Sequence, residues 1–443
     1  MSSQILSTSD AAELDQLTST HRVAAPLVTG AEQLADVNMA YLVSQYPAIS
    51  HTFILREVLH LRSLGAQISV CSVNDPDRDS AGLTAEERDE ASRTYYLKAH
   101  GAVGALAAML KTLLTRPFGF VAGLGFAFGL AGTDIRKFAY SLFYFIEAMM
   151  LGQWMQRKEK QHVHVHFATP ASTVAQVATR IFPISYSITV HGPDEFYDAP
   201  GYKLAEKIRD AAFICCIGTY SRSQLMKLSA PHMWDKFEVS PLGVDAEKFA
   251  PQSPPESPTF EVICVGRLVP AKGQHILLQA IDHMVSAGRD VRLRVVGNGP
   301  DMDSLQADAR RRGIEKHVVF EGAVNQDRIR ELYSRAHAFA LASFAEGIPV
   351  VLMEAMAMEI PCVTTFITGH PELIRHGVDG LLVAPSDDEE LADALSHLMD
   401  NPKRRAALGK AGRLRVQDKY HLQRNAARLG EIFKRRQRTL RQA

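Results

Sequence analysis

The chain has 443 residues, which is too long for one ordinary domain and sufficient for two or three, each with its own core. Apolar residues make up 46% of the sequence and charged residues 22%, as is usual for a globular protein. The 49 Lys and Arg residues balance the 49 Asp and Glu residues, which argues against a dedicated nucleic-acid-binding protein.

The five cysteines show neither the spacing of metal ligands nor a redox pair. Most lie in apolar runs, such as Cys215 and Cys216 between Ile214 and Ile217, where cysteine behaves as a small hydrophobic residue. An odd number of such cysteines indicates a reducing, cytoplasmic location.

Residues 1–36 are predicted to form a loose leader. The first 30 residues contain acidic side chains and have neither the basic start nor the apolar centre of a signal peptide.

A first α/β domain is predicted over residues 37–244. An apolar strand pattern is followed by a polar loop, a helical pattern and a second strand, which is typical of a parallel sheet with right-handed crossovers. The predicted strands are residues 37–43, 67–73, 163–167, 185–190, 213–217 and 237–239, and the first helix is residues 53–64.

Residues 117–133 contain no charged side chain and many glycines. Three alternatives are open for this segment: packing in the core, a helix spanning a membrane, or an apolar surface lying on a membrane. The stretch is slightly shorter than the roughly 20 residues that a spanning helix needs. Flanking cations at Lys111, Arg116, Arg136 and Lys137 suit the third alternative.

A linker is predicted over residues 245–259, where four prolines interrupt any regular element. A second α/β domain follows over residues 260–415, and a final basic helix over residues 416–443 is expected to pack back on the first domain. Two successive domains of this kind are expected to face each other across a cleft that binds a ligand. The strands of the second domain are predicted at residues 261–265, 291–296, 318–320, 338–341 and 362–364.

The strongest chemical signal follows the strand at residues 338–341. Glu346 lies in a loop, Gly347 and Ile348 lead into a helix whose first turn is marked by Pro349, and Glu354 lies about one turn further along. The N–H groups at the start of this helix suit a phosphate, and the two carboxylates suit two ends of one ligand better than one metal ion. An ordinary loop–helix junction with two solvated glutamates is the alternative.

Two further loops follow strands of the same predicted sheet. In residues 266–273, Arg267 and Lys272 place two cations at a strand end, where they suit a phosphate. In the loop that follows the strand at residues 291–296, Gly297 and Asn298 suit a base or ribose. Each of these patterns is weak when taken alone.

Histidines mark the first domain. His191 and Gly192 follow a predicted buried strand, where an imidazole is either an active-site group or a capping residue. His162, His164 and His166 alternate on a strand and therefore share one face. A metal site there is not favoured, because no acidic or cysteine partner lies near them in the sequence. The loop over residues 44–53 lacks the GxGxxG pattern of a dinucleotide oxidoreductase.

Together, these motifs resemble the retaining glycosyltransferases of family 4, which have the two-domain GT-B fold. The resemblance covers nearly the whole chain after residue 37, and the loop over residues 44–53 further resembles the branch that builds bacterial exopolysaccharides, including colanic-acid-type transferases. It rests on Glu346 and Glu354 with seven residues between them, on the loops around Arg267, Lys272 and His191, and on residues 240–245 and 369–374. Two positions depart from the family pattern: residues 47–49 lack a Gly-Gly pair, and His370 replaces an aliphatic residue.

The resemblance implies a role for each matching residue. Arg267 and Lys272 would bind the donor diphosphate and stabilise the departing nucleotide, and Glu354 would hold the ribose hydroxyls. Glu346 would contact the donor sugar near its reacting carbon, and His191 would lie beside the sugar and phosphate. No metal ion or other cofactor is implied.

The resemblance predicts an enzyme that transfers a sugar, with retention, from a nucleotide sugar to a glycan or lipid-linked acceptor in cell-surface polysaccharide synthesis. A GT-B-fold epimerase or phosphorylase, or an inactive scaffold in a polysaccharide assembly complex, are the alternatives. No nucleic-acid partner is expected. The apolar segment at residues 117–133 and the basic C-terminal helix suggest contact with the inner face of the plasma membrane.

Overall fold

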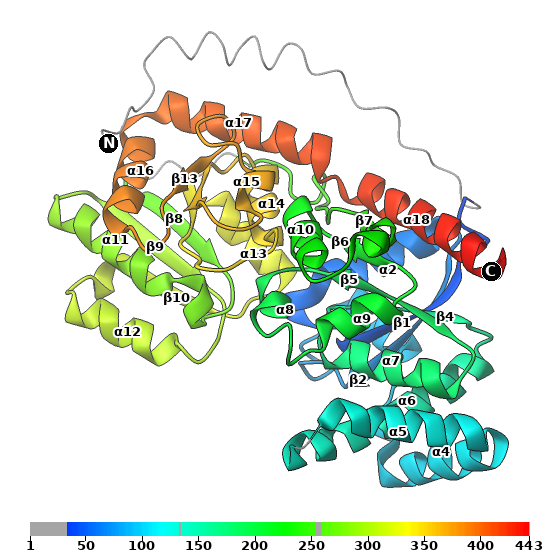
Figure 1. Ribbon diagram of the computed structural model, residues 1–443. Helices are drawn as coiled ribbons and strands as arrows, with labels where there is room; N and C mark the ends of the chain where they lie inside the picture. Colours follow the sequence, from blue (N-terminus) through cyan, green and yellow to red (C-terminus); the bar gives the residue numbers. More distant parts are fainter. Residues whose placement is uncertain (1–32, 133, 253–257, 443) are drawn as a thin grey trace. The chain divides into compact units, whose positions relative to one another are not determined.

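The computed structural model describes residues 33–132, 134–252 and 258–442. The chain forms two compact units, each built around a parallel β-sheet of its own (Figure 1). The described parts of Val28–Pro241 and Arg424–Ala443 form the N-terminal unit, and Leu242–Gln423 form the C-terminal unit. The first 32 residues of the predicted leader lie outside the described residues.

The N-terminal unit contains a seven-stranded sheet in the order β3-β2-β1-β4-β5-β6-β7. Every neighbouring pair is parallel, so each connection crosses over the sheet as the βα alternation of the sequence predicts. The strands are β1 (Asn38–Gln45), β2 (Gln67–Asn74), β3 (Tyr95–Tyr96), β4 (His162–His166), β5 (Ser185–Val190), β6 (Ile214–Cys216) and β7 (Phe237–Val239).

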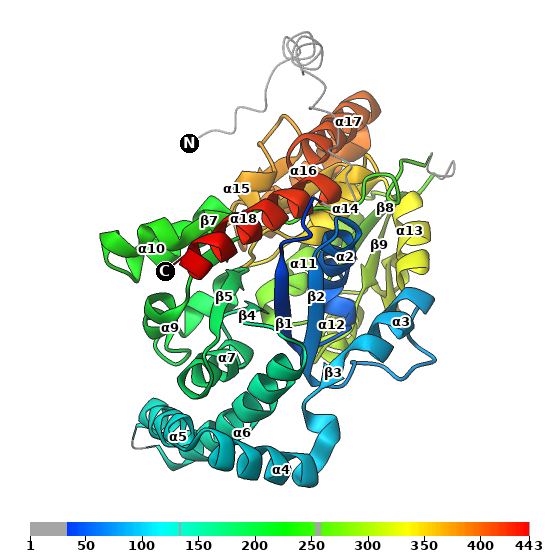
Figure 2. The same ribbon diagram turned by 90° about the vertical axis from the view of Figure 1, so that its right-hand side faces the viewer.

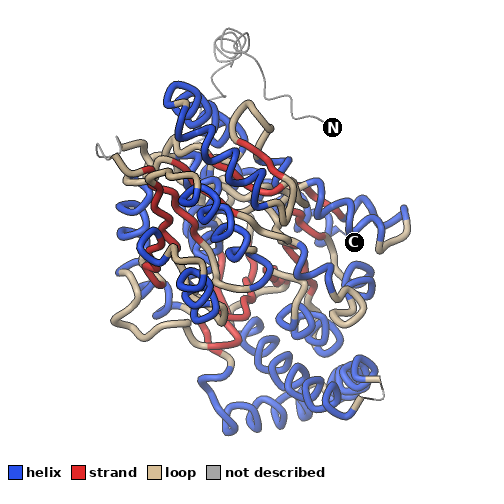
Figure 3. Tube along the Cα trace, turned by 90° about the vertical axis from the view of Figure 1, so that its left-hand side faces the viewer, coloured by secondary structure: helices blue, strands red, loops and turns tan. Residues whose placement is uncertain are grey.

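Helices cover both faces of this sheet, because side chains alternate along each strand and bury apolar groups on either side (Figures 2 and 3). One face packs against α6 and α7, and the other packs against α2 and α18. The helices of this unit are α2 (Thr52–Ser63), α3 (Ala85–Arg93), α4 (Gly101–Thr115), α5 (Pro117–Ala131), α6 (Ile135–Arg157), α7 (Pro170–Ile181), α8 (Pro193–Tyr197), α9 (Leu204–Asp210), α10 (Thr219–Lys227) and α18 (Leu422–Gln442).

The uncharged segment at residues 117–133 forms α5, apart from its last two residues, and Thr133 lies outside the described residues. The helix packs on α6 and α7 through a narrow face of small residues that includes Gly123 and Ala127. Its other side is open to solvent, where Phe118 is 90% exposed. Across residues 33–132, 134–252 and 258–442, no helix is both long and apolar enough to cross a bilayer.

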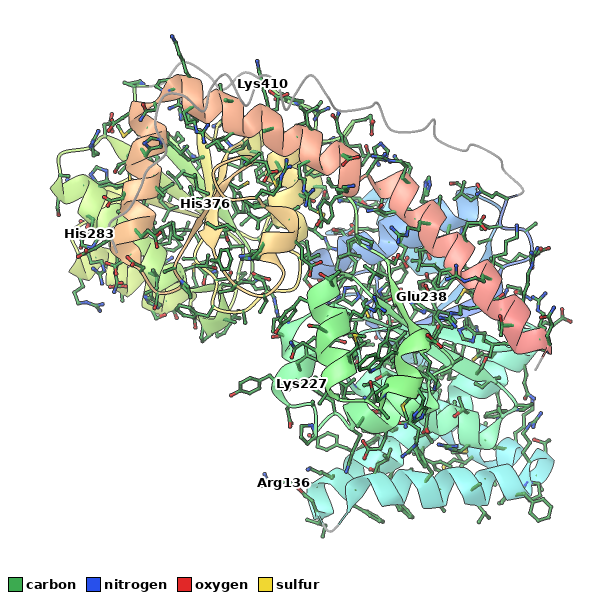
Figure 4. The ribbon with its side chains drawn as sticks, turned by 45° about the horizontal axis from the view of Figure 1, so that its top comes forward. Arg136, Lys227, Glu238, His283, His376 and Lys410 are labelled. Atoms are coloured by element: carbon green, nitrogen blue, oxygen red, sulfur yellow. The ribbon has the colours of Figure 1, made fainter. Side chains whose placement is uncertain are left out.

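Helix α18 returns the chain to the N-terminal unit and closes the second face of its sheet. Phe433 is fully buried there, in the same core as residues of α2 and β1. Arg435 and Arg436 both form ion pairs with Glu238 of β7, which lies beside the helix in Figure 4. Arg438 pairs with Asp36, so part of the predicted basic surface is neutralised within the protein.

The C-terminal unit contains a six-stranded parallel sheet in the order β10-β9-β8-β11-β12-β13. The chain order reverses direction at β8 and β11, which is the position where open α/β sheets bind ligands. The strands are β8 (Phe260–Val265), β9 (Val291–Val296), β10 (Val318–Gly322), β11 (Ala338–Leu341), β12 (Cys362–Thr365) and β13 (Leu381–Val383), and the helices are α11 (Gln274–Ser286), α12 (Met302–Arg311), α13 (Gln326–Ser334), α14 (Val350–Ala357), α15 (His370–Leu373), α16 (Asp388–Asp400) and α17 (Pro402–Lys419).

The described boundaries differ from the predicted ones in three places. Leu34 is fully buried in the N-terminal unit, so packed structure begins before residue 37. Phe249 lies in the predicted linker but is buried against the Tyr333 ring, with centroids 6.2 Å apart, which makes this segment part of the C-terminal unit. The final helix expected over residues 416–443 is divided between α17 and α18.

Candidate functional site

Four loops of the C-terminal unit follow neighbouring strands at the carboxyl edge of its sheet. They come after β8, β9, β11 and β12, and they carry every candidate residue predicted for this unit except Glu354, which lies in the helix that follows one of them. The structure therefore brings these residues to one edge, as expected from the parallel strand order.

Close packing of the first two loops explains their glycines. The Leu268 N–H donates to the Asn298 carbonyl at 3.0 Å, which ties the loops together. Gly297 has φ of +138°, and a Cβ atom there would lie 1.9 Å from the Gly266 carbonyl oxygen. A Cβ atom at Gly299 would lie 2.2 Å from the carbonyl oxygen of Leu268, so neither position has room for a side chain.

The loop after β8 is also fixed to the loop after β11. Gly273 has φ of +61°, and a Cβ atom there would lie 2.1 Å from the Ala342 carbonyl oxygen. The Phe344 N–H donates to the Ala271 carbonyl at 2.8 Å. This contact places Lys272 beside the loop that carries Glu346.

Lys272 and Glu346 form an ion pair, with the Lys272 Nζ on the Glu346 Oε1. The Ser343 hydroxyl donates to the same oxygen at 2.9 Å, and Thr368 of the loop after β12 donates to the Glu346 backbone carbonyl. Both charged side chains are largely buried, with 15% of the Lys272 side chain and 10% of the Glu346 side chain exposed. Burial strengthens the attraction between the two charges but also removes both from water, which opposes it.

Arg267 differs from Lys272 because its side chain is exposed at the same edge. Its backbone carbonyl accepts a hydrogen bond from the Gln274 Nε2 at 2.8 Å, which fixes the loop below it. The Asn298 Oδ1 accepts from the Gly299 N–H at 2.8 Å and so supports its own turn. An exposed guanidinium beside this rigid turn is suited to forked hydrogen bonds with phosphate oxygens.

Glu354 lies in the second turn of α14, which begins at Val350 with Pro349 as its N-cap residue. Gly347 and Ile348 precede this start. Glu354 is 4% exposed, and its Oε2 accepts a hydrogen bond from the Tyr333 hydroxyl at 3.4 Å. Burial and the adjacent carboxylate raise the pKa of Tyr333 well above its usual value, so the phenol stays protonated as a donor.

His370 follows β12 and is fully buried. Its Nδ1 lies 2.8 Å from the Thr365 carbonyl oxygen, which can only accept, so Nδ1 carries the proton of a neutral ring. Burial lowers the pKa of His370, in agreement with the neutral form. Among the described residues, its Nε2 is one of the buried polar atoms without a hydrogen-bond partner.

His191 belongs to the N-terminal unit, where it follows β5 and is 8% exposed. Its ring lies against Phe167 and Phe53, with centroids 4.3 Å and 5.0 Å away, and its Nε2 is 3.0 Å from the His166 Nδ1. Burial, together with the neighbouring His166 and His51, lowers the pKa of His191 well below its usual value. The ring is therefore neutral at pH 7.

Two charged residues of this region were not found from the sequence. Glu195 of α8 accepts hydrogen bonds from the backbone N–H groups of Ala168, His191 and Gly192, and so fixes the loop that carries His191. Lys207 of α9 donates to the Ala168 carbonyl at 2.8 Å. Burial raises the pKa of Glu195 to about 7 and lowers the pKa of Lys207 to about 7.

A sequence signal was present for one of them. Glu195 is the third residue after Gly192, the spacing of a helix capping box. Lys207 had no local signal because its partner lies 39 residues earlier in the chain.

The three alternating histidines of β4 do lie on one face of the strand, but two of them bind serine and threonine hydroxyls, and His166 contacts His191 and Glu57. The His162 ring contacts Ser185 and Ser187, both at 2.7 Å, and the His164 ring contacts Ser187 and Thr189, both at 2.8 Å. No group of three or more His, Cys, Asp or Glu side chains suited to a metal ion occurs within the part of the chain that the structure describes.

Comparison with known families gives the site its context. Residues 245–415 match the family model described as "Glycosyl transferases group 1". This range of the chain is similar to group 1 glycosyltransferases. The matched range begins before β8 and ends within α17, so it contains all four loops described above.

Curated relatives agree with the resemblance expected from the motifs. The chain is 31% identical over 240 residues to a GDP-mannose-dependent α-(1-6)-phosphatidylinositol monomannoside mannosyltransferase of Mycolicibacterium smegmatis, across 51% of this chain and 62% of that enzyme. It thus spans less than two thirds of that relative. It is 24% identical to a putative colanic acid biosynthesis glycosyltransferase of Escherichia coli over 81% of this chain and 90% of that protein.

Solved structures show the same fold over most of the chain. Anabaena HepE in complex with UDP matches 90% of this chain and 100% of its own length, with a TM-score of 0.68 and 17% identity. Sucrose-phosphate synthase of Thermosynechococcus elongatus matches 90% of this chain and 98% of its own, with a TM-score of 0.71 and 17% identity. The predicted GT-B class, with two Rossmann-like α/β domains, is confirmed.

Proposed function

We propose that the chain transfers a sugar, with retention of configuration and without a metal ion, from a nucleoside-diphosphate sugar to a glycan or lipid-linked acceptor. The observation that carries this proposal is the buried Lys272–Glu346 ion pair, held by Ser343 at the carboxyl edge of the sheet. The product would be a cell-surface polysaccharide, exopolysaccharide or glycolipid, as the names of the relatives suggest.

The donor diphosphate would bind Arg267 and Lys272. Departure of the nucleotide breaks the bond between the sugar carbon and the diphosphate oxygen, and negative charge builds up on that oxygen. Fixed cations lower the energy of this step because they are already oriented when the charge develops. The N–H groups at the start of α14, near Gly347 and Ile348, would add to this stabilisation.

The remaining residues would position the donor and the acceptor. Glu354 would accept hydrogen bonds from the ribose hydroxyls, and Gly297 and Asn298 would border the nucleoside. Glu346 would lie near the reacting carbon once the diphosphate has taken over its interaction with Lys272. The acceptor hydroxyl would bond to that carbon on the face from which the diphosphate leaves, and its proton would leave with the products.

Substitution of Lys272 by methionine tests this proposal, because methionine keeps the volume and removes the charge. Loss of one fixed charge-stabilising group typically lowers kcat by about 100-fold or more. Transfer would be measured with UDP-, GDP- and ADP-sugars in the presence of a lipid extract from the host. Lys410→Met is the matched control, since Lys410 is an exposed lysine of α17 in the same unit (Figure 4), and we expect its kcat to stay within about twofold.

Undiminished transfer by Lys272→Met would refute the assignment. An epimerase would change the donor without moving sugar to an acceptor, a phosphorylase would release a sugar phosphate, and an inactive scaffold would bind nucleotide without turnover. Product analysis by mass spectrometry separates these outcomes.

We also propose that the protein acts in the cytoplasm at the inner face of the plasma membrane. The contact would be the α4–α6 face, defined as the exposed apolar side chains of α4, α5 and the start of α6. Leu114 is 81% exposed, Phe118 is 90% exposed and Ile135 is 85% exposed. Such a cluster of exposed apolar side chains is rare on the surface of a soluble protein. The proposed partner of this face is an anionic lipid surface, because residues 101–144 contain four Lys and Arg residues and a single acidic residue, Asp134.

A further inference from the structure

A chain of buried hydrogen bonds connects α2 to His191 through the end of β4. The Tyr41 hydroxyl donates to the Glu57 Oε1 at 2.7 Å, and the His166 Nε2 lies 3.1 Å from the same oxygen. The His166 Nδ1 lies 3.0 Å from the His191 Nε2. Glu57, His166 and His191 are 6%, 0% and 8% exposed, so water has little access to these bonds.

The fold brings these three groups together from distant parts of the sequence. Glu57 lies on the face of α2 that also buries Ile54 and Val58 against the sheet. Strands β4 and β5 pair in parallel with His166 opposite Thr189, which places His191 just beyond the end of the pairing. This is the carboxyl edge of the N-terminal sheet, the edge at which sheets of this class bind their ligands.

The donor and acceptor order along the chain follows for an ionised Glu57 and a neutral His166. An ionised Glu57 carboxylate can only accept, so the His166 Nε2 must carry the proton that it donates. The Nδ1 of a neutral His166 is then an acceptor, and the His191 Nε2 must be the donor to it. Since a neutral imidazole carries one N–H proton, the His191 Nδ1 is left with a lone pair.

We propose that Glu57 and His166 are positioning residues that hold His191 as its Nε2–H tautomer, so that its Nδ1 accepts a hydrogen bond from a hydroxyl group of the bound substrate. The substrate in this inference is the one of the proposed function. The tautomer of His191 is inferred from the hydrogen bonds alone. A lone pair cannot bind a phosphate oxygen. His191 therefore recognises a hydroxyl of the sugar or acceptor and not the diphosphate.

The rings around His166 and His191 keep the arrangement in place. The Phe53 ring lies 6.3 Å from the His166 ring and 5.0 Å from the His191 ring, and the Tyr41 ring lies 5.5 Å from the His166 ring. Rotation of either imidazole would require these aromatic neighbours to move. The neighbouring pair His162 and His164 bonds to hydroxyl groups, which can donate or accept, and so has no comparable anchor.

The tautomer can be measured directly on the wild-type protein. Histidine-selective ¹⁵N labelling and long-range ¹H–¹⁵N correlation distinguish protonated from unprotonated ring nitrogens, and a His191→Asn sample identifies the signals of His191. We expect a protonated Nε2 and an unprotonated Nδ1. A His191 protonated at Nδ1 would overturn the proposal, since the order along the chain would then run the other way.

A variant then tests whether Glu57 sets this state. Glu57→Met keeps the length of the side chain but removes the acceptor, and we expect His191 to become a mixture of tautomers. In a transfer assay kcat should fall by about tenfold or more with KM changed by less than about threefold, because tautomer control of an active-site histidine acts on the reaction step. Ser185→Ala removes a hydrogen bond to His162 on the same pair of strands and should leave the His191 signals and kcat unchanged.

Unchanged His191 signals in Glu57→Met would also overturn the proposal. Failure of the proposed function would look different: the wild-type protein would show the expected tautomer but no sugar transfer with any donor. The two ideas can therefore be rejected separately.

Discussion

Glu354 is buried in the second turn of α14, and its carboxylate accepts a hydrogen bond from the Tyr333 hydroxyl. If it also holds a ribose diol, Glu354→Gln should weaken the binding of UDP or GDP by about 10- to 100-fold, as expected for hydrogen bonds to a charged group. Calorimetric titration would measure this change. The 2′,3′-dideoxy analogues provide the control, since wild type and variant should bind them equally. A variant that loses as much affinity for the analogues would place Glu354 away from the ribose.

Buried histidines make the stability of the N-terminal unit depend on pH. Burial lowers the pKa of His162 to about 3 and lowers the pKa values of His164 and His191 well below the usual value. The unfolded state therefore binds more protons below pH 6.5, so stability is complete above that pH and decreases as the pH falls toward 3. Between pH 6.5 and 5, His162 alone should cost about 2 kcal/mol of unfolding free energy.

Tryptophan fluorescence during urea unfolding measures this effect in one unit, because Trp154 and Trp234 are the only tryptophans and both lie in the N-terminal unit. His162→Asn should show a smaller loss of stability between pH 7 and 5 than the wild type. His232→Gln, at an exposed position in the same unit, should keep the wild-type pH dependence. If the unfolding free energy of all three proteins decreased equally between pH 7 and 5, His162 would not be protonated on unfolding.

At the scale of single residues, the sequence identified the candidate side chains better than it identified the residues that contact them. Alternation along a strand was sufficient to place His162, His164 and His166 on one face. It could not show that His166 bonds to Glu57, because these residues are 109 positions apart and meet only through the packing of α2 on the sheet. The ion pair between Lys272 and Glu346, 74 positions apart, was missed for the same reason.

Among the elements, α4, α5 and α6 carry a prediction about membranes. The double substitution Leu114→Glu and Phe118→Glu should lower binding to vesicles of phosphatidylcholine and phosphatidylglycerol by at least about tenfold, since each apolar side chain contributes roughly 1.5–3 kcal/mol when fully buried. Flotation at low salt measures the bound fraction. Binding to pure phosphatidylcholine should be weaker, because the cations of this segment then lack anionic partners.

Helix α18 supplies the matched control. Its core and the α4–α6 core lie on opposite faces of the N-terminal sheet, so the basic helix and the apolar segment do not form one surface. Arg435→Gln and Arg438→Gln should therefore leave vesicle binding unchanged. Loss of binding in these variants, with full binding in the double glutamate variant, would assign the membrane contact to α18 instead.

Strands and loops differed in how well the sequence predicted them. Strands such as β5 and β9 were predicted with their observed ends, because apolar residues alternate with polar ones along each of them. β3 and β13 were missed, because their two and three residues are too few to show a period, although the equally short edge strand β7 was predicted. The glycine-rich loops were recognised from the sequence. That Gly273 and Gly297 are needed for the loops to contact one another was not.

For the whole molecule, two α/β units followed from the repeated strand–helix alternation and its interruption by prolines near residue 250. The junction itself was less predictable. Residues 242–252 lack a regular element yet bury Val244, Ala246 and Phe249 in the C-terminal unit, which composition alone does not reveal. Boundaries of this kind are set by tertiary contacts, and these contacts also divide the last two helices between the units.

The return of α18 also has a consequence for the order in which the protein can fold during its synthesis. A ribosome makes residues 33–241 first, then the whole C-terminal unit, and only afterwards the helix that carries Phe433. Until then, the second face of the first sheet is covered by α2 but lacks α18, whose Phe433 packs against Tyr41 and His164. The N-terminal unit is thus begun before the C-terminal unit and completed after it, so a nascent chain leaves part of this apolar face uncovered until α18 has been made.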